Sequence, residues 1–309
     1  MRILVVGAGA LGGYFGARLL AAGRDVTFLV RPGTAELLER NGLRVRSVVG
    51  GDLDLPTPPL VRVGEAVGLY DLILLGPKAQ DLGSAIAACE GAVGSESAVL
   101  PLLNGMAHMA VLDRTFGAQH VLGGACLISA TRDREGTIHN LHPADRLLFG
   151  ERVPHTVTNL DAIEVALTGA GFDAQRRDHI EQDMWEKWMF IASLAGITGL
   201  MRATVGEVLA AGAQGFVLGV IEECSAVAEV EGFAPSSQFV AQARTLLMQE
   251  GSTLKASLLR DLEAGEPIER QQIVGDLLER GLAHGLALPL LSVVDANLRC
   301  YEGQQERTR

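Results

Sequence analysis

The chain has 309 residues, of which 48% are hydrophobic and 20% are charged, and its formal net charge is −11. This length predicts a large buried core divided between about two domains. The negative charge argues against a nucleic-acid partner, because phosphates favour clustered Lys and Arg.

Neither a membrane segment nor a metal site is expected. The longest nearly uncharged run, 188–201, is shorter than the ~20 residues that a helix needs to cross a bilayer. The first predicted strand begins at residue 2 or 3, which leaves no room for a signal peptide. The cysteines, at 89, 126, 224 and 300, have no paired metal-ligand spacing and no disulfide framework. We therefore expect buried thiols, a cytoplasmic location and no metal.

The first 30 residues predict a strand at 3–6, a glycine turn at 7–12, a helix at 13–22 and a strand at 25–30. The turn reads Gly-Ala-Gly-Ala-Leu-Gly. A G-x-G-x-x-G motif between a strand and a helix is typical of dinucleotide binding.

Each position of this turn has an expected role at a dinucleotide. Gly7 allows the tight turn, Gly9 lets a pyrophosphate approach the backbone, and Gly12 lets the helix pack on the strand. The N–H groups at the helix start, at Ala10 and Leu11, favour the negative diphosphate.

Arg31 follows the second strand and indicates which cofactor is used. An NAD site expects an acidic residue about 20 positions after the glycines, whereas this chain has Arg31 and no acid before Glu36. A guanidinium suits a 2′-phosphate, so the sequence predicts NADP(H). The alternative is that Arg31 is a solvated loop charge.

Strands and helices continue to alternate after a polar stretch at 44–61. A strand at 72–75 ends in Gly-Pro-Lys78, and a strand at 98–103 ends in Asn104-Gly-Met. Such alternation predicts a doubly wound parallel sheet. Its carboxyl ends line the ligand site, so the glycine turn, Arg31, Lys78 and Asn104 should meet there.

The rest of the chain changes character twice. Short strands at 122–129, 137–140 and 146–149, separated by turns at 132–136 and 142–145, predict an antiparallel extension of the sheet. A helix at 159–168 and a strand at 173–175 would complete this domain. Helical patterns then cover 180–202, 205–231, 235–249, 252–264, 267–284 and 289–302. The predicted fold is a Rossmann-type α/β domain at 1–178 and an all-α domain at 179–309, which we expect to supply the substrate and catalytic residues discussed next.

Lys187 lies in a helix that is apolar on nearly every face, so we expect it to be largely buried. Helical spacing places Ile191, Ala195 and Thr198 on the same stripe. A buried ammonium needs an anionic or polar partner, which could be a substrate carboxylate or carbonyl. An ion pair with Glu186 or a snorkelling side chain is an equally good reading.

Two further polar residues have both a functional and a structural interpretation. Pro267 indicates a first helical turn, in which the Glu269 carboxylate would favour the helix dipole. Glu269 could instead orient a substrate or Lys187. Ser257 is either a ligand for a substrate or a hydroxyl within a helix.

Together these segments resemble the ketopantoate reductase family, the NADPH-dependent 2-dehydropantoate 2-reductases, over essentially the whole chain. The segments are GAGALG at 7–12, Arg31, PKAQD at 77–81, LLNGM at 102–106, WEKW at 185–188, GE at 206–207, SLLRD at 257–261, Glu269 followed by Gly275, and HGLALP at 284–289. The resemblance implies an oxidoreductase that acts on CH–OH groups and reduces a 2-oxo acid, by default ketopantoate in pantothenate biosynthesis.

The resemblance also implies roles for individual residues. It assigns the pyrophosphate to the three glycines, the 2′-phosphate to Arg31 and the cofactor side of the site to Lys78. Asn104 would lie near the nicotinamide and the reacting carbonyl. Lys187 would be the general acid, Glu269 a second catalytic carboxylate, and Ser257 a contact of the substrate carboxylate.

Three positions depart from the family pattern. The family has asparagines four and eight residues after the lysine, where this chain has Ile191 and Ala195, and a third where it has Val205. An apolar replacement leaves a substrate hydroxyl without its partner. The alternatives are therefore a more hydrophobic 2-oxo acid or a non-catalytic NADP(H)-binding sensor. The sequence leaves a homodimer open.

Overall fold

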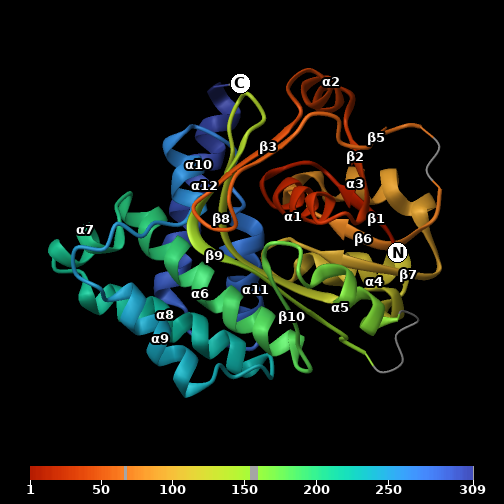
Figure 1. Cartoon of the computed structure of the whole chain (residues 1–309). Coiled ribbons are helices and arrows are strands. Elements are labelled where there is room, and N and C mark those ends of the chain that lie inside the picture. The colour runs from red at the N-terminus through yellow and green to blue at the C-terminus, as the bar shows by residue number, and fades with distance from the viewer. Residues whose placement is uncertain (66–67, 154–158, 309) are drawn as a thin grey trace. The chain divides into compact units, whose positions relative to one another are not determined.

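The computed structural model describes residues 1–65, 68–153 and 159–308. The chain forms two compact units (Figure 1). The first contains Met1–Leu103 and His108–Ile180, and the second contains Asn104–Ala107 and Glu181–Arg309. The short segment that begins with Asn104 therefore belongs to the second unit, although the first unit surrounds it in sequence.

A five-stranded parallel sheet forms the centre of the first unit. Its order is β5-β2-β1-β6-β7, and every neighbouring pair is parallel, as the alternating pattern predicts. The strands are β1 (Arg2–Val6), β2 (Asp25–Val30), β5 (Leu60–Arg62), β6 (Tyr70–Leu75) and β7 (Val93–Pro101). Because all strands run the same way, their carboxyl ends lie along one edge.

A second five-stranded sheet lies in the same unit. It has the order β10-β9-β3-β4, with β8 paired to β9. Its strands are β3 (Leu43–Ser47), β4 (Leu53–Leu55), β8 (Gly123–Arg132), β9 (Ile138–Gly150) and β10 (Asp173–Arg176). The expected antiparallel pairing is present between β8 and β9, whereas β9 is parallel to β3 and β10. These strands form a second sheet and do not continue the first one.

Two sequence-based expectations about these strands are wrong. The polar stretch at 44–61 contains most of β3 and all of β4, and it leads into β5. The predicted turn at 142–145 lies within β9, which is a single strand. Asn140 pairs with Ala130 and Asp145 with Ile128, so four residues of β9 face one residue of β8. Pro143 cannot donate a ladder hydrogen bond and lies within this bulge.

Helix α1 (Ala10–Ala21) packs against strands of both sheets. A Cβ atom on Gly16 would lie 2.5 Å from the ring of Phe28 on β2, and one on Gly13 would lie 2.3 Å from Ile138 Cδ1 on β9. Small residues are therefore required on both faces of α1. The other helices up to residue 180 are α2 (Pro32–Asn41), α3 (Leu82–Cys89), α4 (Ala107–Phe116) and α5 (Leu160–Leu167), with 3₁₀ turns η1 (Ala79–Asp81), η2 (Glu90–Ala92) and η3 (Ala118–His120).

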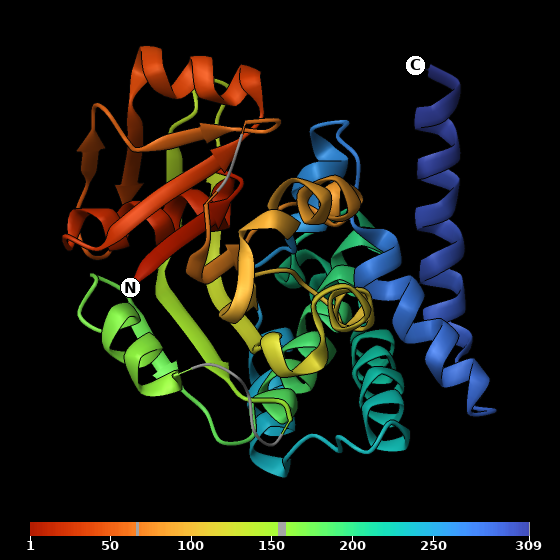
Figure 2. The ribbon, with the colours of Figure 1, turned by 90° about the vertical axis from the view of Figure 1, so that its right-hand side faces the viewer.

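Among its described residues the second unit contains helices joined by loops and no strand, as predicted. Its helices are α6 (Ile180–Met201), α7 (Val205–Ala210), α8 (Gln214–Val230), α9 (Ser237–Leu247), α10 (Ser257–Glu263), the π-helical turn η4 (Gln271–Gly275), α11 (Asp276–Ala283) and α12 (Pro289–Thr308). Figure 2 shows α12 as one continuous helix. The predicted helix at 205–231 is interrupted at Gly212, which has a φ of +82°.

The cysteines follow the expectation at three of four positions. Cys89, Cys126 and Cys224 are buried, but Cys300 is exposed on α12, so the prediction of four buried thiols is wrong there. Among the residues that the structure describes, no helix is both long and apolar enough to cross a membrane.

Candidate active site

The glycine turn has the geometry that a diphosphate requires. Gly7 has a φ of +88°, and a Cβ atom on Gly12 would lie 2.2 Å from the carbonyl oxygen of Gly7. The nearest atom to a Cβ on Gly9 would be Gly76 O, at 3.8 Å. Gly9 is the N-cap of α1 and no side chain caps this helix. The helix start, at Ala10 and Leu11, therefore suits an anionic group.

Arg31 follows β2 and is the N-cap of α2. Its Nη2 lies 2.6 Å from Asp81 Oδ1, and the two side chains are 60% and 39% exposed. Arg31 is therefore a largely solvated side chain that forms an ion pair, which leaves both of its sequence-based interpretations open. Lys78 is exposed, and its carbonyl accepts a hydrogen bond from the N–H of Asp81, which closes the turn η1.

Arg132 is a candidate that the sequence analysis assigned to a turn. It is the last residue of β8, and its Nη1 donates to the carbonyl oxygen of Ala8, 3.1 Å away, in the glycine turn. The guanidinium of Arg132, like that of Arg31 a candidate for contact with the cofactor, therefore lies beside the glycine turn. Only the register of β8 against β9, which pairs Arg132 with Ile138, brings it there.

Lys187 and Asn104 meet within the second unit. The Lys187 Nζ donates to Asn104 Oδ1 at 3.0 Å. Lys187 is partly buried, not largely buried as predicted, because its long side chain extends from an apolar helix to a polar partner. Glu186, the alternative partner, accepts a hydrogen bond from the backbone N–H of Ser236 at 2.8 Å.

Backbone contacts fix the positions of both residues. Gly105 has a φ of +76°, and a Cβ atom there would lie 2.3 Å from the carbonyl oxygen of Gln272. On α6, the indole Nε1 of Trp188 donates to the carbonyl oxygen of Ile273 at 2.9 Å. The π-helical turn η4 therefore contacts the loop of Asn104 through Gly105 and the helix of Lys187 through Trp188. Such turns occur frequently at functional sites.

Glu269 and Ser257 lie at the starts of helical segments. Glu269 precedes the first helical residue, Arg270, so the prediction that it lies inside a first turn set by Pro267 is wrong. Glu269 is partly buried, and its carbonyl accepts from the N–H of Ile273 at 3.1 Å. Ser257 is exposed as the first residue of α10.

The stripe beyond Lys187 is mostly closed to ligands in this structure. Ala195 is 1% exposed and Val205 is fully buried, whereas Ile191 is partly exposed. Thr198 is also buried; it donates to Leu194 O at 2.7 Å and accepts from the N–H of Ala256 at 3.3 Å. Of the three departures from the family pattern, Ile191 is the one whose side chain is not buried.

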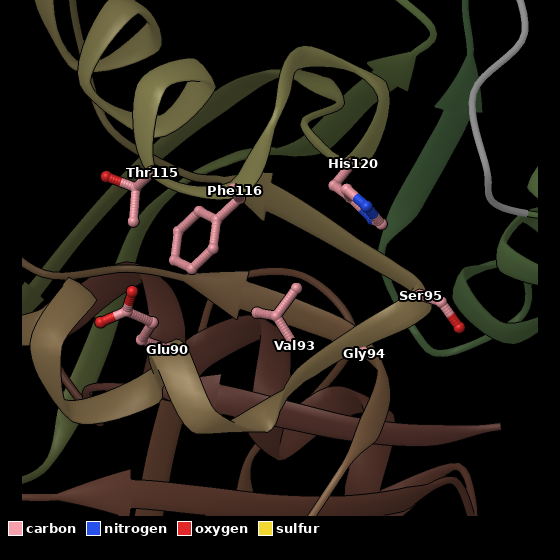
Figure 3. Close-up of a pocket in the computed structure, with 7 residues that line it drawn as sticks. All are labelled: Glu90, Val93, Gly94, Ser95, Thr115, Phe116 and His120. Carbon is pink, nitrogen blue, oxygen red and sulfur yellow. The ribbon is translucent and has the colours of Figure 1, made fainter.

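A pocket of about 300 Å³ lies elsewhere in the first unit (Figure 3). It is lined by Glu90, Val93, Gly94, Ser95, Thr115, Phe116 and His120. Val93 begins β7, so the pocket lies at the amino end of that strand. The glycine turn and Lys78 follow carboxyl ends, which separates this pocket from the dinucleotide site. Within the described ranges, no three His, Cys, Asp or Glu side chains form a metal-binding group.

The parallel sheet, with its glycine turn between β1 and α1, defines a dinucleotide-binding protein. The model of the ketopantoate reductase PanE/ApbA family matches residues 3–154, and the model of its C-terminal domain matches 179–302. The chain therefore belongs to the ketopantoate reductase family, whose members are oxidoreductases acting on CH–OH groups with NAD(P)H.

Individual relatives match over nearly the full length. The chain is 36% identical to the Bacillus subtilis protein named "Uncharacterized oxidoreductase YkpB", over 99% of this chain and 100% of that one. It is 25% identical to a 2-dehydropantoate 2-reductase of Mesorhizobium japonicum, over 97% of each chain. The crystal structure of a 2-dehydropantoate 2-reductase from Geobacter metallireducens superposes with a TM-score of 0.87 at 30% identity, covering 97% of this chain and 99% of that one.

Proposed function

We propose that this protein reduces a 2-oxo acid to a 2-hydroxy acid with NADPH, and that Lys187 is the general acid. Ketopantoate is the first substrate to test, and with that substrate the protein would act in cytoplasmic pantothenate biosynthesis. The observation that carries the proposal is the 3.0 Å hydrogen bond from Lys187 Nζ to Asn104 Oδ1. This bond places a proton donor, Lys187, next to Asn104, whose amide can donate a hydrogen bond to a carbonyl or carboxylate.

The chemistry divides between cofactor and protein. When bound, the nicotinamide cofactor would supply the hydride that the carbonyl carbon of the substrate receives. Lys187 stabilises the negative charge that develops on the carbonyl oxygen and then delivers its proton there. Asn104 holds the Nζ of Lys187 in position, and Glu269 and Ser257 orient the substrate. A proton donor fixed by a neighbouring amide loses little conformational freedom during the reaction.

Residues of the first unit hold the cofactor in this proposal. The glycine turn and the start of α1 bind the diphosphate, Arg31 binds the 2′-phosphate, and Lys78 contributes further positive charge. The uncapped helix start and the close approach of Gly12 to Gly7 support this assignment.

A more hydrophobic 2-oxo acid is the second candidate substrate. It is favoured by Ile191, which lies one helical turn after Lys187 and is partly exposed. The family has an asparagine at this position, so the loss of an amide here would remove a hydrogen-bond partner for a substrate hydroxyl.

The test is NADPH oxidation with ketopantoate and a panel of apolar 2-oxo acids. Lys187→Ala should lower kcat by about 10²–10⁴-fold, the usual contribution of a general acid, and should keep NADPH binding. Lys255→Ala is the matched control, because Lys255 pairs with Glu263 on the surface. Unchanged turnover in Lys187→Ala would refute the general-acid role. NADPH binding without turnover of any panel member would support the sensor reading instead.

A further inference from the structure

The pair formed by Arg31 and Asp81 has a feature that the dinucleotide fold does not require. Asp81 occupies the N-cap position of α3, where an aspartate ordinarily accepts a hydrogen bond from the helix. Its carboxylate makes no such bond. It lies 2.6 Å from Arg31 instead.

Hydrogen bonds position the backbone on both sides of the pair. The N–H of Asp81 donates to Lys78 O at 2.9 Å, and the hydroxyl of Ser84 donates to Asp81 O at 2.8 Å. The carbonyl of Arg31 accepts from the N–H groups of Thr34 and Ala35, both at 2.9 Å. The backbone of both residues is therefore positioned so that the two side chains can pair, while both remain accessible to solvent.

We infer that Asp81 is a specificity-determining residue that narrows the preference for NADPH over NADH. The inference rests on the proposed binding of the 2′-phosphate by Arg31. A 2′-phosphate that reaches Arg31 must share the guanidinium with the carboxylate and lies within a few ångströms of its negative charge. A ribose 2′-hydroxyl meets no such repulsion and can donate to the carboxylate, as at NAD sites. Arg31 would thus bind the 2′-phosphate of NADPH, and Asp81 would accept a hydrogen bond from the 2′-hydroxyl of NADH.

The size of the effect follows from the exposure of the pair. Two like charges a few ångströms apart at a solvated surface repel enough to change a dissociation constant about tenfold for a phosphate near its double negative charge. Salt screens such a surface interaction, so the effect should shrink as ionic strength rises.

Fluorescence titration of the full-length protein with NADPH and with NADH tests the inference. Asp81→Asn should tighten NADPH about tenfold at low salt, leave NADH unchanged or weaker, and retain part of its effect in an Arg31→Ala background. Asp54→Asn is the matched control, because Asp54 pairs with Arg46 on another surface of the same unit. Weaker NADPH binding in Asp81→Asn, or equal changes for both cofactors, would overturn the inference.

Arg31→Ala separates this inference from the proposed function. NADPH binding should weaken far more than NADH binding in this variant. An equal loss for both cofactors would remove the proposed role of Arg31. A selective loss, combined with an Asp81→Asn variant that does not change the ratio of the two dissociation constants, would overturn only the role of Asp81.

Discussion

Replacing Gly105 by alanine tests whether the backbone around η4 fixes the lysine–asparagine pair. The added Cβ would lie 2.3 Å from Gln272 O, against an ordinary contact of at least 3.4 Å, so the loop must move by about 1 Å. Left-handed backbone at φ +76° costs a further ~1–2 kcal/mol for a residue with a Cβ. Overpacking adds ~1–3 kcal/mol.

Movement of the loop should affect turnover more than cofactor binding. The Nζ of Lys187 is 3.0 Å from Asn104 Oδ1, and a shift of about 1 Å takes this pair beyond hydrogen-bond distance. Misplacement of a reacting group by this amount costs about 10²-fold in rate. We expect that loss in kcat, with a much smaller change in the dissociation constant of NADPH, because the residues proposed to bind the diphosphate and the 2′-phosphate lie in the other unit.

The assay is steady-state NADPH oxidation with the best 2-oxo acid of the panel, beside thermal unfolding and NADPH titration. Gly265→Ala controls for backbone strain, because Gly265 has a φ of +69° and nothing within 4 Å of its Cβ position. Gly215→Ala controls for the substitution itself, since Gly215 lies in α8 with open space around it. A kcat for Gly105→Ala equal to that of Gly265→Ala would refute the reasoning.

Three further outcomes are expected. Arg132→Ala should weaken NADPH and NADH by the same factor in titrations, because Arg132 lies at the glycine turn and not at the 2′-position; a selective loss of NADPH would contradict this. Ile191→Asn should raise kcat/KM for ketopantoate relative to apolar 2-oxo acids, as measured across the panel, and an unchanged ratio would exclude Ile191 as a determinant. Burial raises the pKa of the Cys89 and Cys224 thiols from 9.0 to about 12, so they stabilise the fold below pH 9 and this stability is lost as the pH rises from 9 to 12, by about 1.4 kcal/mol per pH unit for each thiol. The free energy of unfolding, measured with urea across that pH range, should fall less steeply in a Cys89→Ala, Cys224→Ala variant. An equal slope in the variant and the original protein would contradict the raised pKa of these thiols.

Local sequence signals predicted the start of the chain well. The second strand begins and ends at the predicted residues, Asp25 and Val30, because a mostly apolar run with a charged residue on either side leaves little ambiguity. The strands β3, β4 and β5 were missed because each is short and carries polar side chains such as Arg44 and Arg46. Their assignment depends on pairing with β9 and β2, which are distant in sequence.

The site was predicted in part. The sequence singled out Lys187 and Asn104 separately, and only folding brings residues 83 positions apart within hydrogen-bond distance. Asp81 lies in the PKAQD segment but received no role of its own, and Arg132 was assigned to a turn, because no local pattern connects them to their partners, Arg31 and Ala8. The departure at Val205 is predicted as a change in the substrate site, and the structure adds that this side chain is fully buried.

The two units divide cofactor recognition from proton transfer. The residues proposed to read the cofactor, Arg31 and Asp81, belong to the first unit, and those proposed to transfer and position the proton, Lys187 and Asn104, belong to the second. A change at Asp81 should therefore alter the ratio of cofactor affinities without altering the response of turnover to Gly105→Ala. Because mutations at independent sites add in free energy, the double variant Asp81→Asn, Gly105→Ala should show both effects at full size, and strong non-additivity would mean that cofactor recognition and proton transfer are coupled.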